Sequence, residues 1–128
     1  MLVGGVDTGE VYMWGNGANG RLGLGIADTV MVPTLLSDPE SRSDALRFKS
    51  VCCGAMHTLG ITQEGLAYSW GCNSNGQLGH GDHTDQLSPT RIALLAATTV
   101  SQVDAGFDFS CTIDCMFAPG SWLSLATG

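Results

Sequence analysis

The sequence has few basic residues. Five Lys and Arg stand against twelve Asp and Glu among 128 residues, which gives a formal net charge of −7. Proteins that bind a phosphate backbone rely on clustered lysine and arginine, so this composition argues against direct binding of nucleic acid. Charged residues of both signs make up only 13% of the chain and apolar residues 44%, which is enough for a hydrophobic core. We therefore expect a folded domain rather than a disordered chain.

Long hydrophobic segments are also missing. No uninterrupted apolar run approaches the roughly 20 residues of a membrane-spanning helix, so we expect no membrane association. The first ten residues, MLVGGVDTGE, have neither the basic start nor the apolar centre of a secretory signal. These features favour an intracellular protein, in the cytoplasm, the nucleus or both.

Paired cysteine motifs are absent. The five cysteines are an odd number and contain no C-x-x-C, which argues against a disulfide framework and against a zinc knuckle. Cys111 and Cys115 are four residues apart, and His80 and His83 are three apart, but neither pair has a matching second pair. We therefore predict no metal site, and we interpret the free cysteines as small apolar residues.

Glycine, by contrast, is abundant, and it marks an internal repeat. The 18 glycines disfavour long helices and suit short strands joined by tight turns. A shift of 56 residues aligns residues 8–25, TGEVYMWGNGANGRLGLG, with residues 64–81, EGLAYSWGCNSNGQLGHG. A shift of 52 aligns residues 51–61 with residues 103–113. We assign the four-residue difference to the polar loop 37–43, because exposed loops accept insertions at little cost.

The repeated segments have the alternation of β-strands. Tyr12 and Trp14 would share one face of a strand, with Val11 and Met13 on the other. Residues 62–65 have the pattern of a hairpin turn whose glycine takes a positive φ, and residues 7–9 are the counterpart. A glycine-rich repeat of 52–56 residues is typical of β-propeller blades rather than of helical repeats.

One set of motifs carries a family resemblance. Gly54-x-x-His57-Thr58, the hairpin turn, Tyr68-x-Trp70-Gly71 and residues 75–81, NGQLGHG, together resemble the repeat of the regulator of chromosome condensation family. The resemblance covers about residues 5–114. It implies four-stranded blades from a seven-bladed ring, so we predict an all-β chain of about two four-stranded antiparallel blades, a partial propeller incomplete at both ends. Such a chain would be a segment of a larger propeller protein.

Four segments follow from the repeat. Residues 1–25 are the second half of a first repeat, and 26–81 are a connection and one nearly complete repeat. Residues 82–114 are a connection and the degraded first half of a third repeat, with Phe109 in place of the histidine. Residues 115–128 are a diverged tail, in which Trp122 falls in register with Trp70, either as a remnant or by accident.

The repeat-signature residues are assigned structural roles, with Trp14 and Trp70 as large apolar anchors in the core of the blades. They are Gly9, Tyr12, Trp14, Gly15, Asn19, Gly20, Leu22, Gly23, Gly25, Gly54, His57, Thr58, Gly65, Tyr68, Trp70, Gly71, Asn75, Gly76, Gln77, Leu78, Gly79, Gly81 and Gly106.

Three motifs suggest chemistry, and the repeat argues against each. Residues 15–20 fit the dinucleotide fingerprint G-x-G-x-x-G, but no good helix follows, and the sister loop 71–76 lacks the middle glycine. His57 has no visible relay partner, and Phe109 at the matching place favours packing. The pair His80 and His83 lies in a loop that we expect to be solvated. We predict no catalytic, metal-binding or cofactor-binding residues.

The sequence therefore predicts a non-catalytic protein-interaction module. The resemblance also implies an alternative, part of a guanine-nucleotide exchange factor for a Ran-type small GTPase. The photoreceptor branch of the family is disfavoured, because Ala55 and Met56 stand where its repeat has Trp-Arg. The expected partners are proteins, with a small GTPase as one candidate. The isolated chain is also expected to self-associate through uncovered blade faces.

Overall fold

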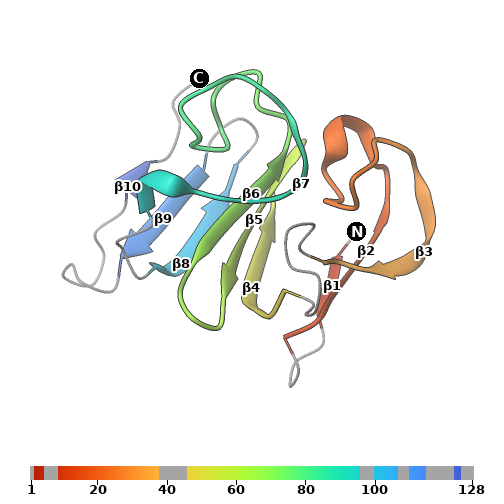
Figure 1. Ribbon diagram of the computed structural model, residues 1–128, viewed down its shortest axis with the longest axis horizontal. Helices are drawn as coiled ribbons and strands as arrows, with labels where there is room; N and C mark the ends of the chain where they lie inside the picture. Colours follow the sequence, from red (N-terminus) through yellow and green to blue (C-terminus); the bar gives the residue numbers. More distant parts are fainter. Residues whose placement is uncertain are drawn as a thin grey trace.

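The computed structural model describes residues 2–4, 9–37, 46–95, 100–106, 110–114 and 123–124. They form ten strands and two short 3₁₀ helices, η1 (Ala18–Gly20) and η2 (Ala93–Leu95). The strands make three antiparallel sheets that lie side by side in chain order (Figure 1). Sheet one is β1 (Leu2–Gly4), β2 (Val11–Gly15) and β3 (Val30–Leu35); sheet two is β4 (Phe48–Cys53), β5 (His57–Thr62), β6 (Ala67–Gly71) and β7 (Gln86–Arg91); sheet three is β8 (Val100–Ala105), β9 (Ser110–Asp114) and β10 (Leu123–Ser124).

This architecture confirms the prediction of an all-β partial propeller, incomplete at both ends. Sheet two has four strands in the order β4-β5-β6-β7, and each flanking sheet has three described strands. By the repeat, β1–β3 correspond to β5–β7, and β8–β10 correspond to β4–β6. Among the described residues, sheet one therefore has no counterpart of β4, and sheet three has no counterpart of β7.

The connections between sheets carry the length difference that the repeat predicted. Residues 36–47 join β3 to β4, and residues 92–99 join β7 to β8, which is four residues fewer. Residues 38–45 of the longer connection lie outside the described residues. The predicted hairpin turn is present at Gly65, whose N–H donates to the Thr62 carbonyl at 2.9 Å with a φ of +86°. Asp7 and Thr8 of its counterpart also lie outside the described part of the chain.

The core consists of two apolar clusters, one on each face of sheet two. The first cluster fills the space between sheets one and two, and the Phe48 and Trp70 rings lie 5.8 Å apart in it. The second cluster faces sheet three and touches Ala105 at the end of β8. The first is formed by Val11, Met13, Leu22, Leu36, Leu46, Phe48 and Trp70, and the second by Leu59, Ile61, Ala67, Ile92 and Leu95.

The two signature tryptophans differ in burial. Trp70 is fully buried, as expected for blade core. Trp14 is only half-buried, which corrects the expectation that both are core anchors. Successive side chains of a strand point to opposite faces, and Val11 and Met13 point toward sheet two. Trp14 therefore points away from sheet two, to a side on which the described residues form no further sheet.

Strand β10 revises the alignment of the tail. Leu123 pairs with Thr112 as Tyr68 pairs with Gly60, so Leu123 takes the place of Tyr68 in sheet three. Trp122 itself lies outside the described residues.

Candidate functional site

The glycine-rich loop of the first repeat, residues 16–25, holds sheets one and two together. We call it the first loop. The carbonyl oxygen of Arg21 accepts two hydrogen bonds from sheet two, from Trp70 Nε1 at 3.1 Å and from Thr58 Oγ1 at 2.9 Å. Gly23 lies so close to the indole that a Cβ there would be 2.7 Å from Trp70 Nε1. The first loop is therefore a clamp between consecutive blades.

The glycine spacing in this loop has a packing explanation. A Cβ on Gly17 would lie 1.9 Å from the carbonyl oxygen of Asp28, so no side chain fits there. The following helix η1 has only three residues and is broken at Asn19, which has a φ of +61°. A dinucleotide fingerprint needs a helix N-terminus to meet the phosphate, and η1 is too short to supply one.

A polar network supports the second loop, residues 72–81. The Asn73 side chain donates to Asp82 Oδ1 at 2.7 Å and accepts from the Leu78 N–H at 3.0 Å. Asp85 accepts from the Asn73 N–H at 2.8 Å and from Asn19 Nδ2 at 3.1 Å. Asp85 therefore connects the second loop to the first. Comparison of the two repeats could not reveal this network, because the first repeat has Gly17 and Thr29 at the positions of Asn73 and Asp85.

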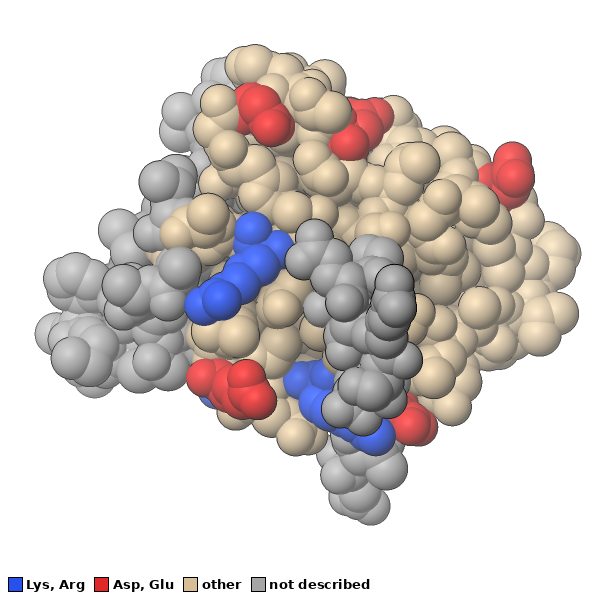
Figure 2. All heavy atoms as spheres, in the orientation of Figure 1, with Lys and Arg blue, Asp and Glu red and all other residues tan. Residues whose placement is uncertain are grey.

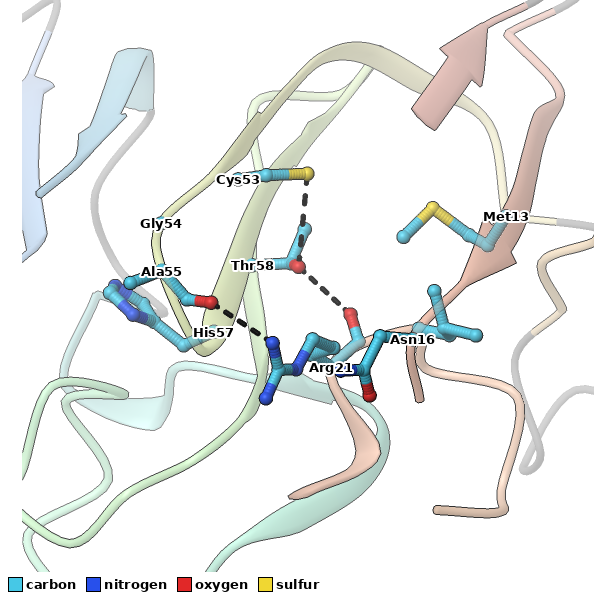
Figure 3. Close-up of a pocket in the computed structure, with 9 residues that line it drawn as sticks. Met13, Asn16, Arg21, Cys53, Gly54, Ala55, His57 and Thr58 are labelled. Carbon is cyan, nitrogen blue, oxygen red and sulfur yellow. Dashed lines mark hydrogen bonds between the residues drawn. The ribbon is translucent and has the colours of Figure 1, made fainter. Parts of the chain in front are cut away.

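A pocket of about 460 Å³ opens between sheets one and two. The Arg21 guanidinium is held at its edge by Nη1–H donation to the Ala55 carbonyl at 3.2 Å and Nε–H donation to the Ala18 carbonyl at 2.9 Å. Figure 3 shows Cys53 and Thr58 across the pocket from Met13. The lining residues are Met13, Asn16, Arg21, Leu22, Cys53, Gly54, Ala55, His57 and Thr58. The pocket thus combines one guanidinium with hydroxyl, thiol, amide and apolar groups.

The Cys53 thiol in this pocket is a poor nucleophile. Burial raises its pKa above the ordinary 9.0, and the weak hydrogen bond from Thr58 Oγ1 at 4.0 Å only partly opposes this. A nucleophilic cysteine needs the opposite shift, toward the thiolate at neutral pH. The Cys53 thiol therefore lacks the lowered pKa of a nucleophilic cysteine.

His57 lies in the packing between sheets rather than in a relay. Its imidazole is buried and points away from Arg21 and Cys53 (Figure 3). Its carbonyl accepts from the Gly54 N–H at 2.8 Å. A Cβ on Gly54 would lie 2.5 Å from both His57 Cε1 and the Gly106 carbonyl. Gly54 therefore allows sheets two and three to approach at this point.

The two loop histidines differ in environment. His83 is exposed, as expected. His80 is half-buried, which corrects the expectation of a solvated pair: its Nε2 lies 2.9 Å from Ser69 Oγ. Because the Ser69 hydroxyl donates to the Leu78 carbonyl at 2.7 Å, its oxygen accepts the Nε2–H of His80. Burial lowers the pKa of His80, opposed in part by Asp82 and by the contact with Ser69.

Charge and metal-ligand groups are sparse in the described part of the chain. On the face shown in Figure 2, basic side chains lie among acidic and uncharged surface rather than in one basic patch. Arg47 pairs with Glu10 at 3.3 Å. Among the described residues, no three His, Cys, Asp or Glu side chains are close enough to hold a metal ion. No helix in the same residues is both long and apolar enough to cross a membrane.

Family models for the regulator of chromosome condensation (RCC1) repeat match most of the chain. One matches residues 8–61 and 64–113, and a second model of the same description matches residues 48–77. Each of the two long matches begins in one sheet and ends in the next. The sequence repeat therefore straddles two blades, which is why the first loop of one repeat clamps onto the strands that follow it.

Curated relatives share this repeat over a small part of their length. The ultraviolet-B receptor UVR8 of Arabidopsis thaliana is 39% identical over 99 residues, covering 77% of this chain and 22% of the receptor. The human E3 ubiquitin-protein ligase HERC2 is 35% identical over 98 residues, covering 77% of this chain and 2% of the ligase. The chain thus spans about a fifth or less of these two relatives.

Solved structures show the same fold. Prp20p of Saccharomyces cerevisiae, whose structure is described together with its binding to Gsp1p and histones, matches with a TM-score of 0.77 and 26% identity. That match covers 92% of this chain and 29% of Prp20p. Human WBSCR16 matches with a TM-score of 0.75 and 25% identity, covering 85% of this chain and 27% of that protein.

Proposed function

This chain belongs to the regulator of chromosome condensation (RCC1) repeat family, and on that premise we propose that it is a non-catalytic protein-interaction module. One observation carries the proposal: the clamp of Arg21 on Trp70 and Thr58 fixes the loop that forms the edge of the pocket. A preformed pocket on a rigid scaffold can bind a partner without paying for loop ordering. We propose that it acts inside the cell, in the cytoplasm or the nucleus.

The pocket chemistry suits a protein segment as its occupant. Arg21 offers a fixed cation, while Met13 and Leu22 offer apolar contact. A partner segment with an acidic residue beside an apolar one would use both features, since a guanidinium recognises carboxylates through paired hydrogen bonds. The raised pKa of the Cys53 thiol and the buried imidazole of His57 support a binding role over a catalytic one.

A Ran-type small GTPase is the first partner to test. The support comes from the likeness to Prp20p, a structure described with binding to Gsp1p. The alternative function is accordingly a part of a guanine-nucleotide exchange factor for such a GTPase. The two functions can be distinguished by experiment. An interaction module binds the GTPase without further effect, whereas an exchange factor also accelerates the release of nucleotide from the GTPase.

Calorimetric titration of the chain with a Ran-type GTPase tests the proposal. The pocket variant is Ala55→Glu, which places a carboxylate beside the Arg21 guanidinium at an exposed lining position and repels an acidic partner residue. The matched control is Ala93→Glu, which adds the same charge at another exposed alanine outside the pocket. We expect binding that Ala55→Glu weakens and Ala93→Glu leaves unchanged. Equal binding by both variants would contradict the pocket as the site.

Release of a fluorescent guanine nucleotide from the GTPase separates the two functions. Binding without faster release is the result expected of an interaction module. Faster release in the presence of the chain would favour the exchange-factor alternative. An absence of any binding would exclude this partner class and, with it, that alternative.

A further inference from the structure

The two glycine-rich loops carry asparagine directly before glycine. The pairs are Asn16-Gly17, Asn19-Gly20 and Asn75-Gly76. Asparagine in this sequence is prone to deamidation, because glycine has no Cβ to hinder the approach of its nitrogen to the asparagine side chain. The glycine nitrogen bonds to the asparagine Cγ, its proton passes to the side-chain nitrogen, and that nitrogen leaves as ammonia. Water then opens the cyclic succinimide at either carbonyl carbon, which gives aspartate or isoaspartate.

The pairs differ in how the attacking glycine nitrogen is held. The Gly20 N–H donates to the Gly17 carbonyl at 2.9 Å, and the Gly76 N–H donates to the Asn73 carbonyl at 3.0 Å. Attack by either nitrogen would break a turn hydrogen bond. Within the residues that the structure describes, the Gly17 N–H has no acceptor. The nitrogen that follows Asn16 is therefore available without the loss of a bond.

A difference between the two repeats leaves the Gly17 N–H without an acceptor. Its counterpart in the second repeat is the Asn73 N–H, which donates at 2.8 Å to Asp85, the residue before β7. The residue at the same place before β3 is Thr29. Both loops and both strands are described, so this difference lies within the repeats themselves.

The Asn16 side chain is polarised for the attack. Its Oδ1 accepts from the Ala18 N–H at 2.9 Å, which would stabilise the oxyanion that forms when Cγ is attacked. Arg21 Nε donates to the Ala18 carbonyl at 2.9 Å, so a positive charge lies in the same turn. The Asn16 side chain is also exposed to water. By contrast, Asn19 Nδ2 donates to the Asp85 carboxylate at 3.1 Å, which restrains the leaving nitrogen and adds negative charge.

We propose that Asn16 is a site of spontaneous deamidation, and that it reacts before Asn19 and Asn75 in the folded chain. The reaction consumes water and requires no enzyme. It goes beyond the proposed function, because it depends on the chemistry of the first loop and on no partner. Failure of GTPase binding would therefore leave the modification site standing, and the reverse also holds.

The isoaspartate product would loosen the first loop. Isoaspartate carries the main chain through its side-chain carboxyl carbon, which lengthens the chain before Gly17. Gly17 has no room to take up the extra length, since a Cβ there would already lie 1.9 Å from the Asp28 carbonyl oxygen. The turn that follows must shift, and with it the Arg21 carbonyl that accepts from Trp70 and Thr58.

Peptide mapping by mass spectrometry, after timed incubation at mildly alkaline pH, measures the order of reaction. Fragment ions separate Asn16 from Asn19 in one peptide, and electron-based fragmentation separates aspartate from isoaspartate. In the folded chain Asn16 should be converted several-fold faster than Asn19 or Asn75, because the other two reactions break a turn hydrogen bond. In concentrated urea the three should react at similar rates. Equal rates in the folded chain, faster reaction at Asn19 or Asn75, or no conversion of Asn16 would overturn the proposal.

Aged variants test the effect on the first loop. Asn16→Ser has no carbonyl carbon to be attacked, and its hydroxyl can accept from the Ala18 N–H. Asn75→Ser is the matched control in the second loop. Urea denaturation of aged wild type and aged Asn75→Ser should show a less stable fraction that grows with isoaspartate at residue 16, and aged Asn16→Ser should show none. Fresh Asn16→Asp, which keeps an acceptor and the normal main chain, should be as stable as fresh wild type. Unchanged stability of a chain that carries isoaspartate at residue 16 would overturn the loosening.

Discussion

The indole nitrogen of Trp70 donates a hydrogen bond to the carbonyl oxygen of Arg21 at 3.1 Å, and this bond joins two consecutive repeats of the chain. The acceptor is a main-chain atom, so its presence does not depend on the side chain at that position. The second repeat accordingly has Gln77 where the first has Arg21. What the contact requires is the loop shape, which the neighbouring glycines provide.

Replacement of Trp70 should weaken the fold more than replacement of Trp14. Trp70→Phe removes the indole N–H and leaves a void in the buried cluster, and we expect a loss of about 1–3 kcal/mol in the free energy of unfolding. Trp14→Phe changes a half-buried ring and should cost less. Urea denaturation measures both losses. An equal loss at the two positions would contradict the clamp.

Alanine at the two loop glycines should separate backbone strain from packing. Gly76→Ala incurs the cost of a positive φ in open space, about 1 kcal/mol. Gly20→Ala incurs a similar cost and also collides with Leu87, so it should be more destabilising. Chemical denaturation of the two variants gives the order. A greater loss of unfolding free energy in Gly76→Ala than in Gly20→Ala would contradict the close packing of Gly20 against Leu87.

Nucleotides should not stabilise the chain. The first loop owes its glycines to turn geometry and to the approach of Asp28 to Gly17, so ATP, GTP or NAD should leave the melting temperature unchanged. Differential scanning fluorimetry with each nucleotide in excess provides the measurement. A concentration-dependent rise in the melting temperature would show binding to the native state and would reverse the packing interpretation.

The oxygen atoms of Asp85 should stabilise the fold mainly as hydrogen-bond acceptors and less through their negative charge. Asp85→Ala leaves the Asn73 N–H and the Asn19 amide without this acceptor, and we expect a loss of about 1–3 kcal/mol in unfolding free energy. Asp85→Asn keeps one oxygen acceptor and should recover part of the loss. Asp28→Ala, at an exposed acidic residue, serves as the control in the same denaturation series. A loss no larger than that of the control would exclude the network.

Stability should fall on mild acidification because of His80. Burial holds the pKa of His80 below the ordinary 6.5, so the unfolded chain binds a proton more readily than the folded one. The contribution of His80 is therefore complete above about pH 6.5 and is lost as the pH falls through its folded pKa. Melting temperatures between pH 7.5 and 5.5 should fall less in His80→Gln than in the wild type. His83→Gln, at the exposed neighbour, should keep the wild-type slope.

The sequence was sufficient to predict the fold because the repeat places the same residue types at the same strand positions twice. The alternation of Val11 and Met13 with Tyr12 and Trp14, and the hairpin glycine at Gly65, follow from local rules that act within one strand or turn. Burial of Trp14 was predicted wrongly, because it depends on whether another sheet covers that face. A local pattern carries no information about such a neighbour.

The candidate site was less accessible to sequence reasoning. The pocket brings Met13 of β2 together with Cys53 of β4, and the repeat does not relate these two positions to each other. The Asp85 network joins residues whose counterparts in the other repeat are different residue types. Half-burial of His80 depends on the hydroxyl of Ser69 on β6, eleven residues earlier in the chain. Such contacts are set by tertiary packing rather than by periodicity.

Hydrogen exchange of the Trp70 indole proton, followed by nuclear magnetic resonance, tests most directly the claim that the first loop joins sheets one and two. If the Arg21 carbonyl holds that proton in the native chain, it should exchange only through the same opening that exposes the core of sheet two. Its protection should then match that of the β5 and β6 amides, and it should exceed that of the half-buried Trp14 indole. A Trp70 indole proton that exchanges as fast as a solvated indole, while those amides stay protected, would contradict the clamp.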